Sequence, residues 1–476
     1  MFAGALVALA FPAASLWWLA WVALVPLLFV IRAAPGPFHG AARAWVGMAG
    51  YVLATQYWLF PSAGPLLAVL AAGLGALWLP WGWAAHRLLT GDPTMRRMLA
   101  AVAVLPSAWV TAEAIRSWER LGGPWAALGA SQWNQPTTLA SAALGGVWLT
   151  SFLIVAVNVA IVGVVVQRSA RLVALPVVLA VLGPAWFWWG PVPAPGPTVR
   201  VALVQPGDIA EASARQAASE SLTEGLAGQR VDLVVWGESS VGVDLTGHPA
   251  ALTRLAELSR RIGADILVNV DARAPAGGIY KSSVLIGPDG SRGSYSKTRL
   301  VPFGEYVPLR PVFGWATRHT KAAAEDRRRG DGLVVLSTGS LAVGPLISFE
   351  ATFSDLARRE IQLGAELLAY QSATSTFQGS WAQPQLASMV AVHAVEVGHP
   401  AVHAGLSGIS SAFDARGGRL GWLPAADRGV LVIDVPLGSH TTVYQRIGNW
   451  VIVAALLILM AWCAQSARRS WTGARR

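Results

Sequence analysis

Ser294-Tyr-Ser-Lys-Thr-Arg-Leu-Val-Pro-Phe-Gly-Glu-Tyr-Val-Pro308 carries two ionisable side chains, Lys297 and Glu305, on either side of an apolar turn. Prolines at 302 and 308 and a glycine at 304 exclude a continuing helix, so the stretch is predicted to be a shaped loop. Rigid irregular loops often hold functional side chains, and we interpret Lys297 as the centre of an active site. An exposed loop lysine without chemistry is the alternative that this stretch alone leaves open.

The composition of the chain is that of a membrane protein. Of its 476 residues, 54% are hydrophobic and 13% are charged, which is about half of the ~25% charged share typical of soluble proteins. Tryptophans gather near the ends of apolar runs, among them Trp18, Trp78, Trp81, Trp188 and Trp189, which predicts interfacial aromatic belts. The arginines are scattered between these runs without a nucleic-acid-binding motif. They therefore predict membrane topology and no nucleic-acid partner.

The cysteine and histidine positions limit the chemistry. The only cysteine, Cys463, lies inside the last apolar run. This excludes an intrachain disulfide, a cysteine-based metal site and a cysteine nucleophile outside that run. His393, His399 and His403 fall near one another, but no Cys or Asp completes a ligand set at metal spacing. We predict no metal and no cofactor.

The apolar runs predict a polytopic α-helical membrane domain of about eight spans at ~20 residues per crossing, the first of them the partial run Phe2–Phe11. The longer runs are Ala14–Ile31, Ala44–Phe60, Pro65–Trp83, Leu99–Ile115, Thr138–Val166, Leu172–Trp189 and Trp450–Ala464. Arginines in alternate loops and after the last span place those loops and the C-terminus in the cytoplasm. The region between Gly190 and Arg446 is then extracytoplasmic.

That region changes character after a stiff, Pro-rich linker. Short apolar runs of strand length alternate with helical patterns, which predicts an α/β domain with a largely buried sheet. The predicted organisation is residues 1–190 as transmembrane helices, 191–198 as linker, 199–440 as the extracytoplasmic domain, and 441–476 as the final transmembrane helix with a basic cytoplasmic tail.

Three predicted strand ends carry reactive groups. Glu238 ends Val231–Glu238, Lys297 follows Tyr295, and Ser348 with Glu350 ends the run that begins at Gly344. Active groups gather where strands end in α/β sheets. A satisfied polar residue at a strand-to-loop junction is the alternative for any one of these side chains, whereas their order at these spacings favours a catalytic set.

On these motifs the extracytoplasmic region resembles the nitrilase (carbon–nitrogen hydrolase) superfamily. With its spans, the chain resembles the bacterial apolipoprotein N-acyltransferase family over nearly its whole length. The resemblance rests on the Ser294–Pro308 stretch and on further motifs: Val201-Ala-Leu-Val-Gln205, Trp236-x-Glu238, Gly123-Pro-Trp-Ala-Ala-Leu-Gly-Ala-Ser-Gln132, Glu396-x-Gly-x-Pro400 and Tyr444-x-Arg-x-Gly-Asn-Trp450. It implies an αββα sandwich with a Glu–Lys–Cys triad.

The resemblance implies a role for each matching residue. Glu238 would be the general base, Lys297 the stabiliser of the oxyanion, and Glu305 and Glu350 supporting carboxylates. The implied reaction is ping-pong transfer of an acyl chain from a phospholipid donor to the N-terminal diacylglyceryl-cysteine of a lipoprotein. The implied location is the inner (cytoplasmic) cell membrane, crossed several times. Nothing in the sequence predicts the oligomeric state.

The sequence departs from the family at the nucleophile, where Ser348-Phe349-Glu350 stands in place of Cys-Tyr-Glu. A serine hydroxyl is much harder to deprotonate than a thiol with a pKa near ~8.5. Family residues of the pocket are also changed, at Ser372–Phe377, Gln385-Leu386, His393 and Leu406–Gly408. Two hypotheses stay open: an acyltransferase with Ser348 as nucleophile, or a homologue without acyl transfer that binds lipid or lipoprotein and modulates a true acyltransferase. A soluble-type amidase leaves the spans unexplained.

Overall fold

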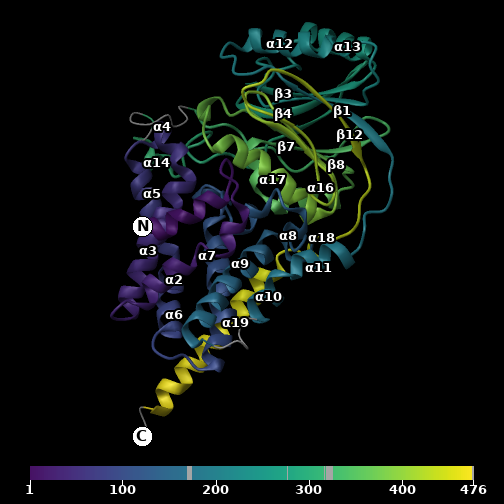
Figure 1. Cartoon of the computed structure of the whole chain (residues 1–476). Coiled ribbons are helices and arrows are strands. Elements are labelled where there is room, and N and C mark those ends of the chain that lie inside the picture. Colours follow the sequence, from purple (N-terminus) through teal and green to yellow (C-terminus); the bar gives the residue numbers. More distant parts are fainter. Residues whose placement is uncertain (169–173, 276, 316, 318–324, 474–476) are drawn as a thin grey trace. The chain divides into compact units, whose positions relative to one another are not determined.

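The computed structural model describes residues 1–168, 174–275, 277–315, 317 and 325–473 (Figure 1). The chain forms two compact units. The helical unit contains Met1–Trp118, Pro124–Gly190 and Ile447–Arg476, and the α/β unit contains Glu119–Gly123 and Pro191–Arg446. The short segment Glu119–Gly123 thus belongs to the α/β unit, although it stands between two apolar helices in the sequence.

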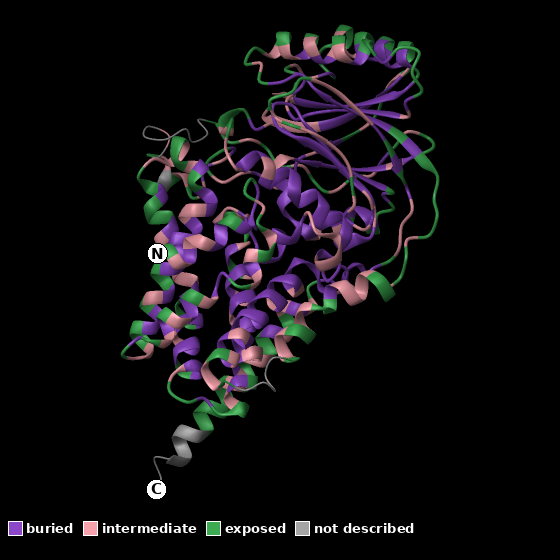
Figure 2. Ribbon diagram, in the orientation of Figure 1, coloured by how far each residue is buried: buried purple, intermediate pink, exposed green. Residues whose placement is uncertain are grey.

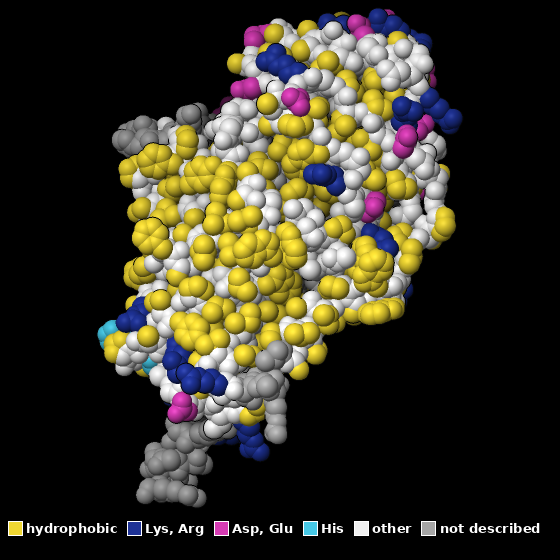
Figure 3. Space-filling model, viewed as in Figure 1, with side chains coloured by type: hydrophobic (Ala, Val, Ile, Leu, Met, Phe, Trp, Pro, Cys, Tyr) yellow, Lys and Arg dark blue, Asp and Glu magenta, His cyan; other side chains and the backbone are white. Residues whose placement is uncertain are grey.

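The helical unit confirms a membrane region. Four stretches of the described residues are long and apolar enough to cross a membrane: Leu66–Leu89, Met95–Arg116, Ala142–Gln167 and Trp450–Arg468. Hydrophobic side chains cover most of the face that this unit presents in Figure 3. The helices of the unit are α1 (Phe2–Ala5), α2 (Val25–Arg32), α3 (Pro37–Gln56), α4 (Phe60–Ala63), α5 (Leu66–Gly75), α6 (Leu79–Leu89), α7 (Met95–Arg116), α8 (Pro136–Leu139), α9 (Ala142–Gln167), α10 (Ala174–Ala180), α11 (Leu182–Trp189) and α19 (Trp450–Gly473).

The number of spans, about eight, stays a prediction. The run Ala14–Ile31 folds as a 3₁₀ turn (Trp17–Trp21) followed by α2, with Pro26 in its first turn. Pro and Gly within such runs interrupt the helical hydrogen bonds, which explains the shorter pieces. The run Leu172–Trp189 lies partly outside the described residues, and its described part forms α10 and α11.

The tryptophans divide between the interior and the surface of the helical unit. Trp18, Trp188 and Trp189 are exposed, as an interfacial belt requires. Trp78 and Trp81 are fully buried, so their assignment to such a belt was wrong. Both pack edge-on against Trp109, with ring centroids 5.4 and 5.3 Å apart, in the buried interior that Figure 2 shows in purple. Edge-to-face aromatic packing is a favourable way to fill such an interior.

The α/β unit is an αββα sandwich, which confirms the predicted fold class. Its sheets have the strand orders β12-β1-β2-β3-β4-β5 and β11-β10-β9-β8-β7-β6. Helices α12 (Ala212–Glu224) and α13 (Pro249–Ile262) cover the first sheet, and α16 (Ser354–Gln362) and α17 (Ala382–Val397) cover the second (Figure 1). The strands are β1 (Thr198–Gln205), β2 (Leu233–Trp236), β3 (Asp265–Arg273), β4 (Ile279–Gly287), β5 (Gly290–Ser296), β6 (Leu336–Ser337), β7 (Ala342–Ile347), β8 (Leu367–Ser372), β9 (Ala401–Gly405), β10 (Ser410–Phe413), β11 (Arg419–Leu423) and β12 (Gly429–Pro436). The short helix α14 (Arg310–Phe313) also belongs to this unit, and α18 (Val443–Ile447) begins in it and ends one residue after Arg446.

Alternation along the strands builds the two layers of the core. In β1, Val201 and Leu203 point into the space between the sheets, while Ala202 and Val204 point toward the covering helices. This follows from the two-residue period of a strand. The parallel strands β1, β2 and β3 end at the same edge of the first sheet, and the parallel strands β7, β8 and β9 end at the same edge of the second.

Candidate active site

Four charged side chains form a closed ring of alternating sign in the α/β unit. Glu238 follows β2, Lys281 lies in β4, Lys297 follows β5, and Glu305 lies in the next loop. The Nζ of Lys281 is 2.6 Å from Glu238 Oε1 and 3.4 Å from Glu305 Oε1. The Nζ of Lys297 is 2.8 Å from Glu305 Oε1 and 3.6 Å from Glu238 Oε1. Each ammonium thus faces both carboxylates, and we call these four side chains the charge ring.

Strand register brings the two lysines together. β3 pairs with β4 so that Asp271 lies opposite Lys281, and β4 pairs with β5 up to Ser296. The Lys297 N–H then donates to the Lys281 carbonyl at 2.8 Å, so Lys297 continues this ladder by one bond. Neighbouring strands are roughly 4.8 Å apart, which leaves both ammonium groups within reach of the same carboxylates.

The loop after Lys297 is shaped as its prolines and glycine predict. Phe303 has a φ of 63°, in the left-handed region, and its N–H donates to Tyr306 O at 2.6 Å. The other oxygen of Glu305, Oε2, accepts from the Val301 N–H at 2.8 Å. Such tight local bonding fixes the direction of the Glu305 side chain toward Lys297.

The charges of the ring reinforce one another. Burial disfavours the ammonium of Lys281, but Glu238, Glu305 and Asp271 outweigh it and raise the pKa of Lys281. Burial likewise disfavours the carboxylate of Glu305, but Lys297 and then Lys281 lower its pKa. For Asp271, the same opposition of burial against Lys281 and Arg327 leaves the pKa lowered. Each of these three groups is therefore charged at neutral pH.

Ser348 lies at the tip of a strained turn. β7 ends at Ile347, Ser348 takes a φ of 52°, and a 3₁₀ helix runs from Ser348 to Thr352. A non-glycine residue in the left-handed region costs of order 1 kcal/mol or more and is characteristic of functional sites. Ser348 is half-exposed, and its hydroxyl makes no hydrogen bond within the described part of the chain. A sharp strand-to-helix turn of this kind presents its side chain to a substrate.

Glu350 ties the turn to the lysine loop. Its Oε1 accepts from Tyr295 OH at 2.7 Å, from the Thr298 N–H and hydroxyl, both at 2.8 Å, and from the Arg299 N–H at 3.0 Å. Its Oε2 accepts from the Ile347 N–H at 2.9 Å. Thr298 follows Lys297 and Ile347 precedes Ser348, so this fully buried carboxylate joins the neighbours of both residues. Because its two oxygens are held by donors from both loops, Glu350 is a supporting carboxylate of the site.

The end of β8 joins Glu238 to the same structure. Glu238 N–H donates to Ser372 O at 3.2 Å, and Ala373 N–H donates to Glu238 Oε2 at 2.9 Å. β8 pairs with β7 so that Gln371 lies opposite Ile347. The Gln371 amide also crosses between the sheets, donating to Trp236 O at 2.8 Å. The base position and the serine turn are thus both attached to the last residues of β8.

Comparison with known proteins agrees with this architecture. The family model described as Carbon-nitrogen hydrolase matches residues 200–445, more than half of the chain, and the model of the Apolipoprotein N-acyltransferase N-terminal domain matches residues 3–160. This chain belongs to the apolipoprotein N-acyltransferase family. Two relatives carry that name: one from Geobacter metallireducens is 29% identical, over 96% of this chain and 93% of its own length. The other, from Pseudomonas syringae pv. tomato, is 27% identical, over 99% and 96% respectively. A solved carbon–nitrogen hydrolase from Helicobacter pylori is similar at 16% identity and a TM-score of 0.39, covering 51% of this chain and 90% of that one.

Three of the four residues of the charge ring were predicted from the sequence. Glu238, Lys297 and Glu305 were predicted, and their side chains lie together; Glu350 was predicted as supporting, and its bonds join Thr298 to Ile347. Lys281 was not predicted. A signal was present, because the sequence contains only three lysines, at 281, 297 and 321. Two of them are in the ring, and Lys321 lies outside the described residues.

The three histidines are separately engaged. His393 Nδ1 lies 2.8 Å from Glu396 Oε2, and its Nε2 lies 2.8 Å from Ala351 O. His403 Nε2 lies 2.6 Å from the Ser372 hydroxyl, and His399 Nδ1 lies 2.9 Å from Val397 O. Burial lowers the pKa of His403 to about 4, so its ring is neutral at physiological pH.

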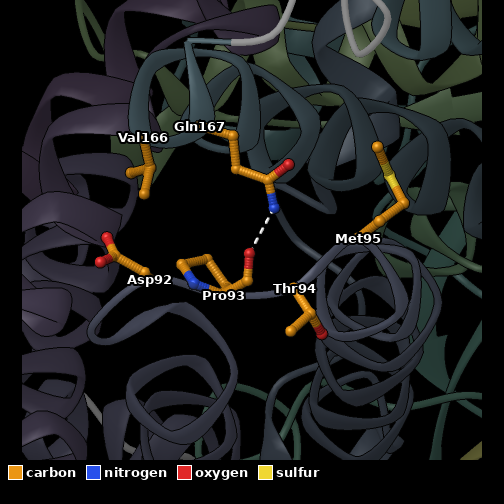
Figure 4. Close-up of a pocket in the computed structure, with 6 residues that line it drawn as sticks. All are labelled: Asp92, Pro93, Thr94, Met95, Val166 and Gln167. Atoms are coloured by element: carbon orange, nitrogen blue, oxygen red, sulfur yellow. Dashed lines mark hydrogen bonds between the residues drawn. The ribbon is translucent and has the colours of Figure 1, made fainter.

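A cavity of about 400 Å³ lies in the helical unit, near the start of α7 and the end of α9 (Figure 4). Asp92, Pro93, Thr94, Met95, Val166 and Gln167 line it. The Gln167 amide donates to Pro93 O and closes one side. None of these residues belongs to the charge ring, so the cavity plays no part in the chemistry considered below.

Proposed function

We propose that this chain transfers an acyl chain from a membrane phospholipid to the α-amino group of the N-terminal diacylglyceryl-cysteine of a lipoprotein, through an acyl-enzyme on Ser348. One observation carries the proposal: the Ser348 hydroxyl, which makes no hydrogen bond among the described residues, stands on a strained turn that Glu350 and β8 tie to a ring of two carboxylates and two ammonium groups. Family membership and the names of the relatives support the choice of substrates.

In the first half-reaction, Ser348 Oγ attacks the ester carbonyl carbon of the phospholipid while Glu238 takes the hydroxyl proton. The carbonyl π electrons move to oxygen, and Lys297 stabilises that oxyanion. An ammonium has three N–H donors, and two of those of Lys297 face Glu305 and Glu238. The third is available for the oxyanion. Collapse breaks the bond to the glyceryl oxygen, which leaves as lysophospholipid with the proton from Glu238.

In the second half-reaction, the lipoprotein amine attacks the acyl-serine carbonyl carbon and gives a proton to Glu238. The second tetrahedral oxyanion forms at the same place and is stabilised by the same ammonium. Its collapse breaks the bond to Ser348 Oγ, which regains the proton, and releases the amide. The balance is one ester bond and one amine consumed, and one amide bond and one hydroxyl formed.

The membrane setting follows from the same proposal. Both substrates are lipids, so an α/β unit seated at the outer leaflet receives them laterally. Arginines in alternate loops support an inner-membrane protein with several spans and an extracytoplasmic α/β unit. The proposal keeps the predicted boundaries between the transmembrane helices, the linker, the extracytoplasmic domain and the final helix, which lie at 190/191, 198/199 and 440/441.

The test is acyl transfer to a fluorescent diacylated lipopeptide in phospholipid vesicles, by wild type, Ser348→Ala and Ser348→Cys. We expect wild-type turnover and a loss of at least ~10³-fold in the alanine variant, because nucleophile removal abolishes the covalent route. The cysteine variant is expected to exceed wild type, since a thiolate forms more readily and a thioester is the better acyl donor to an amine.

Equal activity of wild type and Ser348→Ala would refute the serine acyl-enzyme. Silence of wild type with activity in Ser348→Cys would mean that the scaffold is competent and that only the nucleophile is lost. Silence of all three folded proteins would favour the homologue that binds lipid or lipoprotein without acyl transfer.

A further inference from the structure

Lys281 is a buried cation that a single Glu–Lys–Ser set does not require. It lies in β4, which pairs antiparallel with β3 and β5, and only 13% of its side chain is exposed. Its shortest contact, 2.6 Å, is with Oε1 of Glu238, the proposed base. That contact is shorter than the 3.6 Å separation between Lys297 and the same oxygen.

A purely structural ion pair with Asp271 does not account for Lys281. Asp271 Oδ2 already receives Arg327 Nη2 at 3.1 Å and the Ser239 hydroxyl at 3.2 Å. Lys281 is 3.7 Å from that oxygen, a full ångström farther than from Glu238. The geometry therefore assigns Lys281 first to Glu238, second to Glu305 and only third to Asp271.

The charge count of the ring depends on Lys281. At rest, Lys281 and Lys297 balance Glu238 and Glu305, while Arg327 balances Asp271. When Glu238 takes the serine proton, the ring becomes net positive by one at the moment when the oxyanion appears. Without Lys281, the resting cluster would be net negative, and it would be only neutral when the oxyanion forms. Preorganised charge of this kind is a large contribution to catalysis in a buried site.

We infer that Lys281 is a positioning residue for this reaction: it holds the Glu238 carboxylate in place and supplies the positive charge that balances the oxyanion after proton transfer. The inference rests on the proposed function and names a residue that the Glu–Lys–nucleophile set does not contain. Lys281 acts through Glu238 Oε1, and its place in β4, opposite Asp271 of β3, holds it at that oxygen.

The groups that face Lys281 determine its effect on pH dependence. They are Glu238 from the end of β2, Asp271 from β3, Lys297 from the end of β5, Glu305 from the following loop, and Arg327 through Asp271. Three of these are carboxylates and two are cations. Removing Lys281 leaves the carboxylates of this cluster in excess of its cations, so the cluster as a whole takes up a proton more readily. Since the reaction needs Glu238 ionised, the acid limb of the rate profile must move to higher pH.

The experiment compares wild type with Lys281→Met and Lys281→Arg in the vesicle assay, measuring kcat, KM and the pH profile of kcat/KM. Labelling of Ser348 by a fluorophosphonate probe follows the first bond formation alone. For Lys281→Met we expect kcat to fall by roughly 10- to 100-fold with little change in KM. We also expect the acid limb of the kcat/KM profile to shift to higher pH by about one unit. Arg292→Met, which removes a cation paired with Asp265 at 3.0 Å in the same sheet, is the matched control and is expected to leave both unchanged.

The outcomes separate this inference from the proposed function. If the wild type is active and Lys281→Met has the same kcat and the same acid limb, only the role of Lys281 is overturned. Should Lys281→Met fail to fold, Lys281→Arg decides: a retained charge must keep the wild-type acid limb, and a shifted limb overturns the inference. If wild type is silent in both assays, the serine mechanism is refuted. The same substitutions in the Ser348→Cys background then test Lys281, and silence there as well overturns its role.

Discussion

Gly123→Ala is expected to damage the site from a position outside the charge ring. Gly123 has a φ of 77°, and a Cβ there would lie 2.8 Å from the ring of Phe349 and 3.0 Å from that of Phe353. Carbon atoms in contact normally lie about 3.5–4.0 Å apart. The two rings must therefore move by several tenths of an ångström to one ångström, and Phe349 directly follows Ser348.

The neighbouring glycine provides a matched control. Gly122 has a φ of 98°, but a Cβ added there meets no atom within 4 Å. Both alanine variants pay the left-handed backbone cost of about 1–2 kcal/mol, whereas only Gly123→Ala adds overpacking, typically another ~1–3 kcal/mol. A displacement of about 1 Å at a reacting group costs up to ~10²-fold in rate. We therefore expect kcat to fall ~10- to 100-fold in Gly123→Ala and less than about threefold in Gly122→Ala.

Acyl transfer and thermal unfolding, both measured in the same micelles, check this prediction. Gly123→Ala should have the lower Tm of the pair as well as the lower kcat. If the two variants share the same kcat and Tm, backbone strain alone explains them, and the contact with Phe349 does not position the serine turn.

Two further substitutions test buried carboxylates of the α/β unit. Glu350→Gln replaces an acceptor oxygen by an amide NH₂ and leaves at least one of the buried N–H donors at Thr298, Arg299 or Ile347 unsatisfied. The substitution should lower the free energy of unfolding of the α/β unit, measured by chemical unfolding, by at least about 2 kcal/mol. A change under about 0.5 kcal/mol would contradict the proposed link between the two loops through Glu350. Glu360 has neither carboxylate oxygen hydrogen-bonded within the described residues, and burial, with the charge of Glu350, raises its pKa to about 8. Because the unfolded chain releases this proton at lower pH, the stability of the wild type falls as the pH rises from 4.5, the ordinary pKa, to about 8. Glu360→Met should therefore raise Tm at pH 8, leave Tm nearly unchanged at pH 4, and flatten the dependence of Tm on pH between them.

Much of the fold can be predicted from local patterns in the sequence. The apolar runs of β1, β2 and β8 are of strand length, and each leads to a polar residue or a turn, so the sheets and the positions of Glu238 and Gln371 at strand ends follow from them. The prolines and glycine after Lys297 likewise predict the shaped loop that aims Glu305. The tryptophans show the limit of such patterns. Trp78 and Trp81 stand near the end of an apolar run, and hydropathy alone does not separate a ring at a membrane interface from one inside a helical bundle.

Lys281 was missed for a different reason. Its three carboxylate partners, Glu238, Asp271 and Glu305, come from three separate segments. Its approach to Glu238 depends on the register between β3 and β4, which places Lys281 opposite Asp271. A shift of one residue would point the lysine to the other face of the sheet. The strand pattern around Lys281 does not encode that register, because Tyr280, Ser282 and Ser283 carry no strong alternation. Only the assembled sheet identifies it as a member of the site.

The choice of lysine at these two positions is itself informative. The chain has 36 Lys and Arg residues, of which only three are lysines, yet both cations of the charge ring are lysine. An arginine guanidinium is a planar fork of five donors, suited to one carboxylate held by both its oxygens. The ring needs the opposite: a compact cation that contacts single oxygens of two carboxylates and keeps a donor for a third oxygen. Lys297→Arg should therefore abolish transfer even though charge is retained, whereas Lys281→Arg, one contact farther from the oxyanion, should keep the pH profile and lose only part of the rate.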